Sequence, residues 1–148
     1  MLLFHYYVQL NIEKEPKALN KIFIGQPWQF MHVGPHELQK LATFINDNGI
    51  DLYLIHPREN NLMVDKLNHK ISIISSSTSS EELINRIIGS NIVDVYTVAS
   101  TLATGLTFNS QIKIISMNDI DPRLKASQDN LALALKSLGI KFEQLDIS

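Results

Sequence analysis

Polar side chains suited to binding a phosphate follow two apolar segments of this 148-residue sequence. His56-Pro57 comes directly after the run Leu52–Ile55, and Ser100-Thr101 comes directly after Val93–Val98. An imidazole titrates near neutral pH, so it can give a proton or a hydrogen bond to a phosphate oxygen. Proline stiffens the turn behind it and would fix the direction of the ring. The adjacent hydroxyl groups, together with unpaired N–H groups at a helix start, would form a second phosphate contact.

Each of these patterns also has a purely structural interpretation. A His-Pro pair after a strand is often a turn with a partly buried histidine, and serine or threonine at a helix start is often only an N-cap. Glu81 and Glu82 begin another expected helix, where they could accept hydrogen bonds from a ribose diol. The same two carboxylates could simply complement the helix dipole. The residues alone leave both interpretations open.

Short apolar runs alternate with longer amphipathic ones along the chain, a pattern that predicts strands separated by helices. The expected strands are Leu2–Leu10, Lys21–Gly25, Asp51–Ile55, Ile71–Ile74, Val93–Val98, Gln111–Ser116 and Ile140–Leu145.

The expected helices carry apolar residues at helical spacing and end at glycines or other stop signals. The first helix carries Leu38, Leu41, Phe44 and Ile45 and ends at Asn48-Gly49. The second runs from Ser80 to Gly89, and a short third helix runs from about Ser100 to Leu106. The fourth runs from Pro122 to Gly139 and carries Leu124, Leu131, Leu135 and Leu138.

This alternation predicts a doubly wound α/β fold with a mostly parallel sheet covered on both faces. In such a sheet the ligand crevice lies beyond the carboxyl ends of the strands. The residues that follow Ile24, Ile55, Ile74 and Val98 are therefore the candidates for a binding site.

The composition excludes several classes of function. Lysine and arginine total 13 against 15 acidic residues, and this net charge of −2 disfavours a nucleic-acid-binding domain. The sequence has no cysteine, which excludes disulfides and thiolate metal sites and suits a cytoplasmic location. No apolar run reaches the length of a membrane span. Neither glycine-rich phosphate motif, G-x-G-x-x-G or G-x-x-x-x-G-K-[ST], is present, so a dinucleotide or triphosphate cradle has no support.

Three strings in this order resemble the bacterial sialyltransferases of glycosyltransferase family 52, which act on lipooligosaccharides and capsules. They are Ile22-Phe23-Ile24-Gly25-Gln26-Pro27, Tyr53-Leu54-Ile55-His56-Pro57-Arg58-Glu59 and Ser100-Thr101, and the resemblance extends from about Lys21 to the C-terminus. It implies a GT-B architecture of two Rossmann-like domains, in which residues 1–148 match the C-terminal, donor-binding domain and the acceptor domain is absent from this chain. It further implies transfer of sialic acid from CMP-Neu5Ac to a galactoside-terminated glycan with inversion, and neither a metal nor another cofactor.

The resemblance also assigns roles to individual residues. His56, with Pro57 behind it, would be the general acid or the phosphate partner that assists the departure of CMP. Ser100 and Thr101 would bind the phosphate.

Further roles concern the nucleoside and the acceptor. Glu81 or Glu82 would hold the ribose, and the segment Gly25-Gln26-Pro27 would line the cytidine pocket. The family has a catalytic aspartate upstream of its His-Pro motif, where this sequence has Gly34-Pro35-His36-Glu37. Glu37 is the carboxylate there that could serve as the base, and a surface role is its alternative.

Two other functions remain compatible with the sequence. One is a noncatalytic α/β interaction module, and the other is a GT-B donor domain for a diphosphate nucleotide sugar. The second would need more basic side chains, since Arg58 is the only obvious cation at a predicted strand end. Peripheral association with the inner face of the cell membrane and a homodimer are both compatible with this composition.

Overall fold

The computed structural model describes residues 20–75, 82, 85, 92–105, 110–118 and 120–148. Within them, six parallel strands form one sheet in the order β3-β2-β1-β4-β5-β6. The strands are β1 (Lys21–Ile24), β2 (Leu52–Ile55), β3 (Ser72–Ser75), β4 (Val93–Thr97), β5 (Ser110–Ser116) and β6 (Phe142–Asp146). The predicted fold class is therefore confirmed. The strand expected at Leu2–Leu10 and most of the helix expected from Ser80 lie outside the described residues.

The central strands β1, β2 and β4 are buried on both faces, which explains their apolar sequences, whereas the edge strand β6 has three exposed residues among its five. Successive side chains of β1 alternate between the two faces, so that Ile22 and Ile24 belong to one core cluster and Phe23 to the other. Tyr53 of β2 and Tyr96 of β4 lie with Phe23, and all three are almost fully buried. The aromatic residues of the central strands thus share one face of the sheet.

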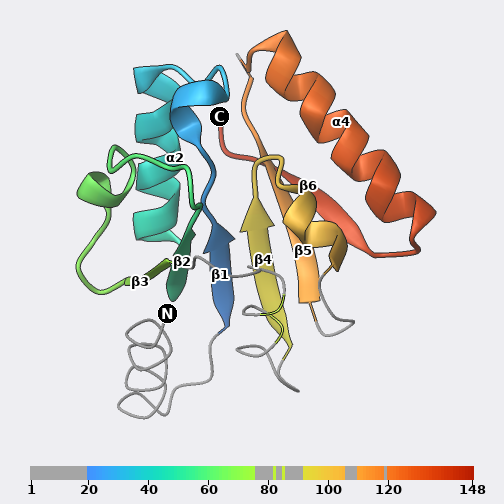
Figure 1. Cartoon of the computed structure of the whole chain (residues 1–148), viewed down its shortest axis with the longest axis horizontal. Coiled ribbons are helices and arrows are strands. Elements are labelled where there is room, and N and C mark those ends of the chain that lie inside the picture. The colour runs from blue at the N-terminus through green and yellow to red at the C-terminus, as the bar shows by residue number, and fades with distance from the viewer. Residues whose placement is uncertain (1–19, 76–81, 83–84, 86–91, 106–109, 119) are drawn as a thin grey trace.

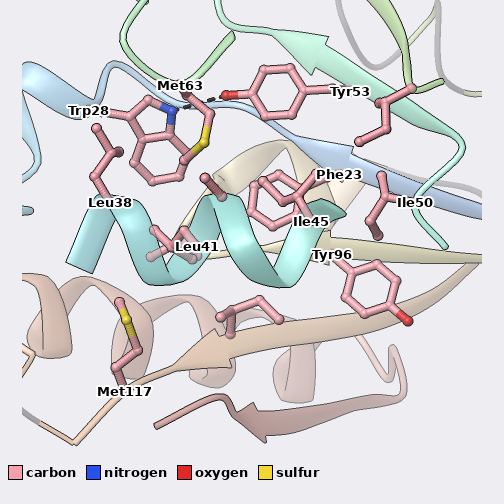
Figure 2. Packing of buried hydrophobic residues seen from close by; sticks show 14 of the residues in the cluster. Phe23, Trp28, Leu38, Leu41, Ile45, Ile50, Tyr53, Met63, Tyr96 and Met117 are labelled. Carbon is pink, nitrogen blue, oxygen red and sulfur yellow. Dashed lines mark hydrogen bonds between the residues drawn. The ribbon is translucent and has the colours of Figure 1, made fainter. Parts of the chain in front are cut away.

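Helix α2 (Pro35–Asp47) packs on this aromatic face. Pro35 occupies its first turn, where a missing N–H costs nothing, and Gly49 follows with a φ of 68°. Its buried stripe recurs at helical spacing and consists of Leu38, Leu41, Ala42 and Ile45. Figure 2 shows Leu38, Leu41 and Ile45 on the side of α2 that lies toward Phe23 and Trp28.

Helix α4 (Pro122–Ser137) connects β5 to β6 and places Leu131 and Leu135 in the core of the opposite face. The side chain of Asp121 caps it by accepting a hydrogen bond from the Arg123 N–H at 2.8 Å. Leu138, which we expected in the apolar stripe, is 60% exposed. The helix ends at Ser137, so Leu138 is its C-cap residue and lies beyond Leu135, the last buried residue of α4.

Three short 3-10 helices complete the described structure. They are η1 (Trp28–Phe30), η2 (Val64–Lys66) and η3 (Thr101–Gly105). The short helix predicted at Ser100–Leu106 is therefore present as the five-residue η3. The sequence pattern did not predict η1, because three residues are too few to show a helical periodicity.

All strands run in one direction, so the residues that follow them meet at one edge of the sheet. Figure 1 shows the arrowheads of β1 and β4 at this carboxyl edge, near the starts of α2 and α4. The strand order reverses between β1 and β4, which is the topological switch point where ligands bind in open α/β sheets. Among the described helices, none is both long and apolar enough to cross a membrane.

Candidate functional site

The four residues His56-Pro57-Arg58-Glu59 form a tight turn at the end of β2, which we call the His-Pro turn. The Glu59 N–H donates to the His56 carbonyl at 3.0 Å, and Pro57 occupies the second turn position, where its fixed φ is favourable. Two side chains reinforce the turn. The His56 N–H donates to Glu59 Oε1 at 3.0 Å, and the Arg58 N–H donates to His56 Nδ1 at 3.0 Å.

The contact with Arg58 determines the protonation of the His56 ring. A backbone N–H can only donate, so Nδ1 must carry a lone pair and the proton of the neutral imidazole lies on Nε2. Partial burial lowers the pKa of His56, and the positive charge of Arg58 lowers it further. No hydrogen bond to Nε2 occurs within the described part of the chain. His56 therefore presents a neutral Nε2–H donor that has no partner among the described residues.

Glu59 is the central acceptor beneath this turn. Its Oε2 accepts hydrogen bonds from the Tyr53 hydroxyl and from Trp28 Nε1, the latter at 3.2 Å. Trp28 Nε1 also donates to the Tyr53 oxygen at 3.0 Å, the contact drawn as a dashed line in Figure 2. Tyr53 and Trp28 are both almost fully buried. One carboxylate thus joins β2, the His-Pro turn and η1.

Burial dominates the electrostatics of this group. It raises the pKa of Glu59 to about 7, although the hydrogen bonds from Tyr53, His56 and Trp28 act in the opposite direction. Burial also raises the pKa of Tyr53 well above its ordinary value, and the neighbouring Glu59 charge adds to this effect. At neutral pH the tyrosine is protonated and Glu59 is close to its titration midpoint.

Gly25 provides the room for Glu59. A Cβ at this position would collide with Glu59 Oε1 and would lie 2.6 Å from the Leu54 carbonyl and 2.7 Å from the Tyr53 hydroxyl. Real Cβ atoms do not approach other heavy atoms this closely, so only glycine fits without a shift of the neighbours. The predicted pocket residue Gly25 therefore borders the carboxylate of the His-Pro turn.

The 3-10 helix η1 packs against the outer side of the same turn. Gln29 Nε2 donates to the Arg58 carbonyl at 2.8 Å. The Arg58 guanidinium lies 5.6 Å from the centre of the Phe30 ring, a cation–π distance. Together with Trp28, every residue of η1 thus contacts the His-Pro turn.

Gln26 joins the ends of the two strands at the switch point. Its side chain is buried, and its Oε1 accepts a hydrogen bond from the Ala99 N–H at 2.9 Å, across 73 residues of sequence. Its Nε2 lies 3.8 Å from Met31 Sδ. Gln26 therefore fixes the segment after β1 against the segment after β4. Pro27 follows as the half-buried residue before η1.

The segment after β4 uses several of its backbone donors internally. The Ser100 N–H donates to Thr97 Oγ1 at 2.9 Å, and the Leu102 N–H donates to Ser100 Oγ at 3.2 Å. The Ser100 hydroxyl proton and the exposed Thr101 hydroxyl have no partner within the described residues. The expected phosphate contact thus rests on hydroxyl groups more than on free N–H groups at a helix start.

Glu37 lies in a different part of the carboxyl edge. It lines a cavity of about 210 Å³ between the starts of α2 and α4, together with His32 and Asp121. His32 has a φ of 58°, an uncommon conformation for a residue with a side chain. No hydrogen bond of the described chain joins Glu37 to His56.

The two residues predicted to bind the ribose are Glu81 and Glu82. Glu81 lies outside the described residues, and Glu82 is an exposed helical residue.

Pro57 is exposed at the tip of the His-Pro turn. Among the residues that the structure describes, no cluster of three or more histidine, aspartate or glutamate side chains could hold a metal ion.

We did not predict from the sequence that Trp28, Tyr53 and Glu59 hold the His-Pro turn in place. In the sequence, Glu59 is only the last residue of the segment that contains His56-Pro57, and nothing there indicates that it is buried. Its burial depends on contacts with residues 6 and 31 positions away. The available signal was the single tryptophan of the chain, three residues after a glycine at a strand end. A large aromatic residue with an N–H group needs a buried acceptor, and Glu59 is that acceptor.

Comparison with known proteins supports the Rossmann-like α/β fold. No family model and no curated protein matches the sequence. Among solved structures, the Bordetella bronchiseptica enzyme WbmH, in complex with NAD+, matches with a TM-score of 0.50 at 12% sequence identity. The match covers 86% of this chain and 56% of that chain, so this chain spans little more than half the length of WbmH. The similarity establishes a Rossmann-like α/β fold like that of this NAD+-binding enzyme.

The connection after β1 differs from a dinucleotide-binding turn. Such a turn is short and rich in glycine, and it leads the pyrophosphate to a helix start. Here residues 25–34 separate β1 from α2, and Trp28 fills the space beside the strand ends with a buried indole.

Proposed function

We propose that this chain is the donor-binding domain of a sialyltransferase that holds CMP-Neu5Ac at the carboxyl edge of the sheet. The observation that carries the proposal is the His-Pro turn, which fixes the neutral His56 ring with its Nε2–H unpaired among the described residues. A rigid, uncharged donor at this edge is suited to receive a phosphate oxygen. The resemblance of the three sequence strings to family 52 supplies the identity of the phosphate compound.

The strand order supports a single site for both phosphate contacts. β2 and β4 flank β1, so His56 and Ser100 follow strands that lie two spacings, or about 10 Å, apart. Gln26 holds the intervening segment against Ala99. One phosphate between the imidazole and the Ser100 and Thr101 hydroxyls would then lie at the topological switch point.

The proposed chemistry is the stabilisation of a leaving group. Breaking the bond between sialic acid and CMP leaves positive charge on the sugar and negative charge on the phosphate. Fixed donors aimed at the developing charge lower the barrier without reorganising. His56 Nε2–H would donate to the departing phosphate oxygen, and the hydroxyl groups would donate to the other oxygens.

A monophosphate suits the charge of this edge better than a diphosphate. Arg58 is the cation of the His-Pro turn, and its guanidinium already lies over Phe30. A second phosphate would bring further negative charge without a further cation from the turn. The charge of this edge therefore favours a CMP-linked sugar over a UDP-, GDP- or ADP-linked sugar.

The reaction also requires an acceptor site that this proposal places beyond the chain. We assign the galactoside acceptor to a second GT-B domain, with Glu37 of this chain as the base on its hydroxyl. The cavity that Glu37 shares with His32 and Asp121 faces the same carboxyl edge and supports this placement.

Nucleotide binding tests the proposal on the chain itself. We expect CMP to raise the melting temperature, while UDP, GDP and ADP leave it nearly unchanged. The double variant Ser100→Ala with Thr101→Ala should weaken CMP binding at least tenfold in calorimetry, because each hydroxyl–phosphate hydrogen bond contributes about 1.5–3 kcal/mol.

The matched control is Thr43→Ala, which removes an exposed hydroxyl from α2, and it should bind CMP with unchanged affinity. Stabilisation by UDP or GDP equal to that by CMP would contradict the donor assignment. A double variant with unchanged CMP affinity would reduce Ser100 and Thr101 to a cap of η3.

A further inference from the structure

The Glu59 carboxylate uses both of its oxygens inside the protein. Oε1 accepts from the His56 N–H at 3.0 Å, while Oε2 accepts from the Tyr53 hydroxyl and from Trp28 Nε1. The three donors come from the turn, from β2 and from η1. A carboxylate with these partners has no oxygen directed to a ligand by the contacts that the structure describes.

Burying the Glu59 carboxylate costs free energy, and the surrounding residues compensate for this cost. A buried carboxylate is unfavourable unless donors compensate for the lost water, and three donors converge on this one. Gly25 lacks the Cβ that would collide with Oε1. Two neighbouring strands and η1 therefore meet around a charge-bearing group that the proposed chemistry does not itself require.

The contact between Glu59 and His56 links the buried carboxylate to the geometry of the His56 ring. Glu59 Oε1 accepts the first backbone N–H of the His-Pro turn and so fixes the backbone there. The same backbone places the Arg58 N–H on His56 Nδ1. The ring direction and its Nε2–H tautomer thus depend on a backbone that Glu59 holds. Gln29 holds the same turn from the other side through the Arg58 carbonyl.

We propose that Glu59 is a positioning residue: it anchors the His-Pro turn to Trp28 and Tyr53 so that His56 presents Nε2–H to the phosphate. The phosphate part of this inference rests on the proposed function, whereas the control of the His56 ring does not. Glu59 itself touches no reacting atom. Its effect passes through the backbone of the turn.

The test compares two variants that remove different partners of the same cluster. Glu59→Leu removes the acceptor of the His56 N–H. Tyr53→Phe leaves that acceptor in place and removes a donor to the other carboxylate oxygen, together with one of the two acceptors of Trp28 Nε1. Long-range ¹H–¹⁵N spectra of the full 148-residue chain report the tautomer of the His56 ring without any nucleotide. Calorimetry with CMP then reports the phosphate contact.

We expect the wild type and Tyr53→Phe to show a single Nε2–H tautomer and CMP affinities within about threefold of each other. Glu59→Leu should show mixed tautomers and bind CMP about tenfold more weakly, the loss expected for one well-placed hydrogen bond. A folded Glu59→Leu chain that keeps the wild-type ring spectrum would overturn the inference. So would equal losses in both variants, because those would reflect stability alone.

Glu59→Gln keeps the test decisive if the leucine variant does not fold. Its amide oxygen can still accept from the His56 N–H, so we expect the wild-type tautomer and CMP affinity within about threefold of the wild type. A tenfold or greater loss of affinity with an unchanged ring spectrum would overturn the positioning role and indicate direct use of the charge. If CMP fails to bind the wild type, the proposed function fails, while the ring spectra still decide the role of Glu59.

Discussion

Glu59 shows at the scale of one residue how a buried charge makes stability depend on pH. Its ordinary pKa of 4.5 is raised to about 7 in the folded protein, mainly because burial disfavours the charged form. The folded state therefore binds a proton more tightly than the unfolded state. The contribution of Glu59 to stability is complete below about pH 4.5 and is lost as the pH rises through about 7.

This linkage predicts a difference between the wild type and Glu59→Gln, which carries no titrating group at this position. The stability of the wild type relative to the variant should fall from pH 4.5 to about pH 7 and then level off. Thermal melts of both proteins across this range measure the difference, since all other titrating groups are shared. Parallel stability curves would mean that Glu59 titrates at its ordinary value.

At the scale of the elements, Gln128 joins α4 to the sheet. Its Nε2 donates to the carbonyls of Val98 at 3.0 Å and Ile115 at 2.5 Å, and the residue is 1% exposed. These carbonyls lie at the ends of neighbouring strands, next to the segment that carries Ser100. A single buried amide thus fixes the helix against the carboxyl edge.

Gln128→Leu should lower stability by about 2–4 kcal/mol, because two buried carbonyl groups would lose their donor. Thermal unfolding measures this loss as a fall of roughly 5–15 °C in Tm. The matched control is Asp129→Ala on the next residue of α4. It breaks an exposed ion pair with Lys125 and should cost less than about 1 kcal/mol. Equal losses of stability in the two variants would show that the buried contacts of Gln128 contribute no more than an exposed ion pair.

The helices and strands could be predicted where their signals are local. The apolar stripe of α2 and the glycine after it lie within one stretch of sequence, and so do the apolar runs of β2 and β5. The parallel sheet then followed from their alternation. Leu138 shows the limit of such local signals. Its spacing fits the apolar stripe of α4, but the helix ends at Ser137.

The site was predictable only in part, for a similar reason. His56 and Ser100 could be named because they directly follow apolar runs. The contacts that fix the His56 ring come from Glu59 and, through it, from Trp28 on another segment. Such long-range partners leave no periodic trace in the sequence, and the three residues of η1 are too short to give one.

The residues that the structure describes form one Rossmann-like sheet, and the proposed ligand contacts lie at its carboxyl edge. The chain spans 56% of the length of WbmH, and we propose that it represents one half of a two-domain transferase. In that arrangement the donor would bind between the domains, with the His-Pro turn and the Ser100 segment on this side. Because a fold alone does not determine its ligand, we propose that these loops select CMP.

Titration of the ¹⁵N-labelled chain with CMP tests whether the carboxyl edge of the sheet is a CMP-sugar site. We expect the largest shift changes at the segments after β1, β2 and β4, including the His56 ring Nε2 and the Ser100 and Thr101 amides. The same titration with UDP should leave these signals nearly unmoved. Changes confined to other surfaces, or equal responses to CMP and UDP, would contradict the assignment of this edge as a CMP-sugar site.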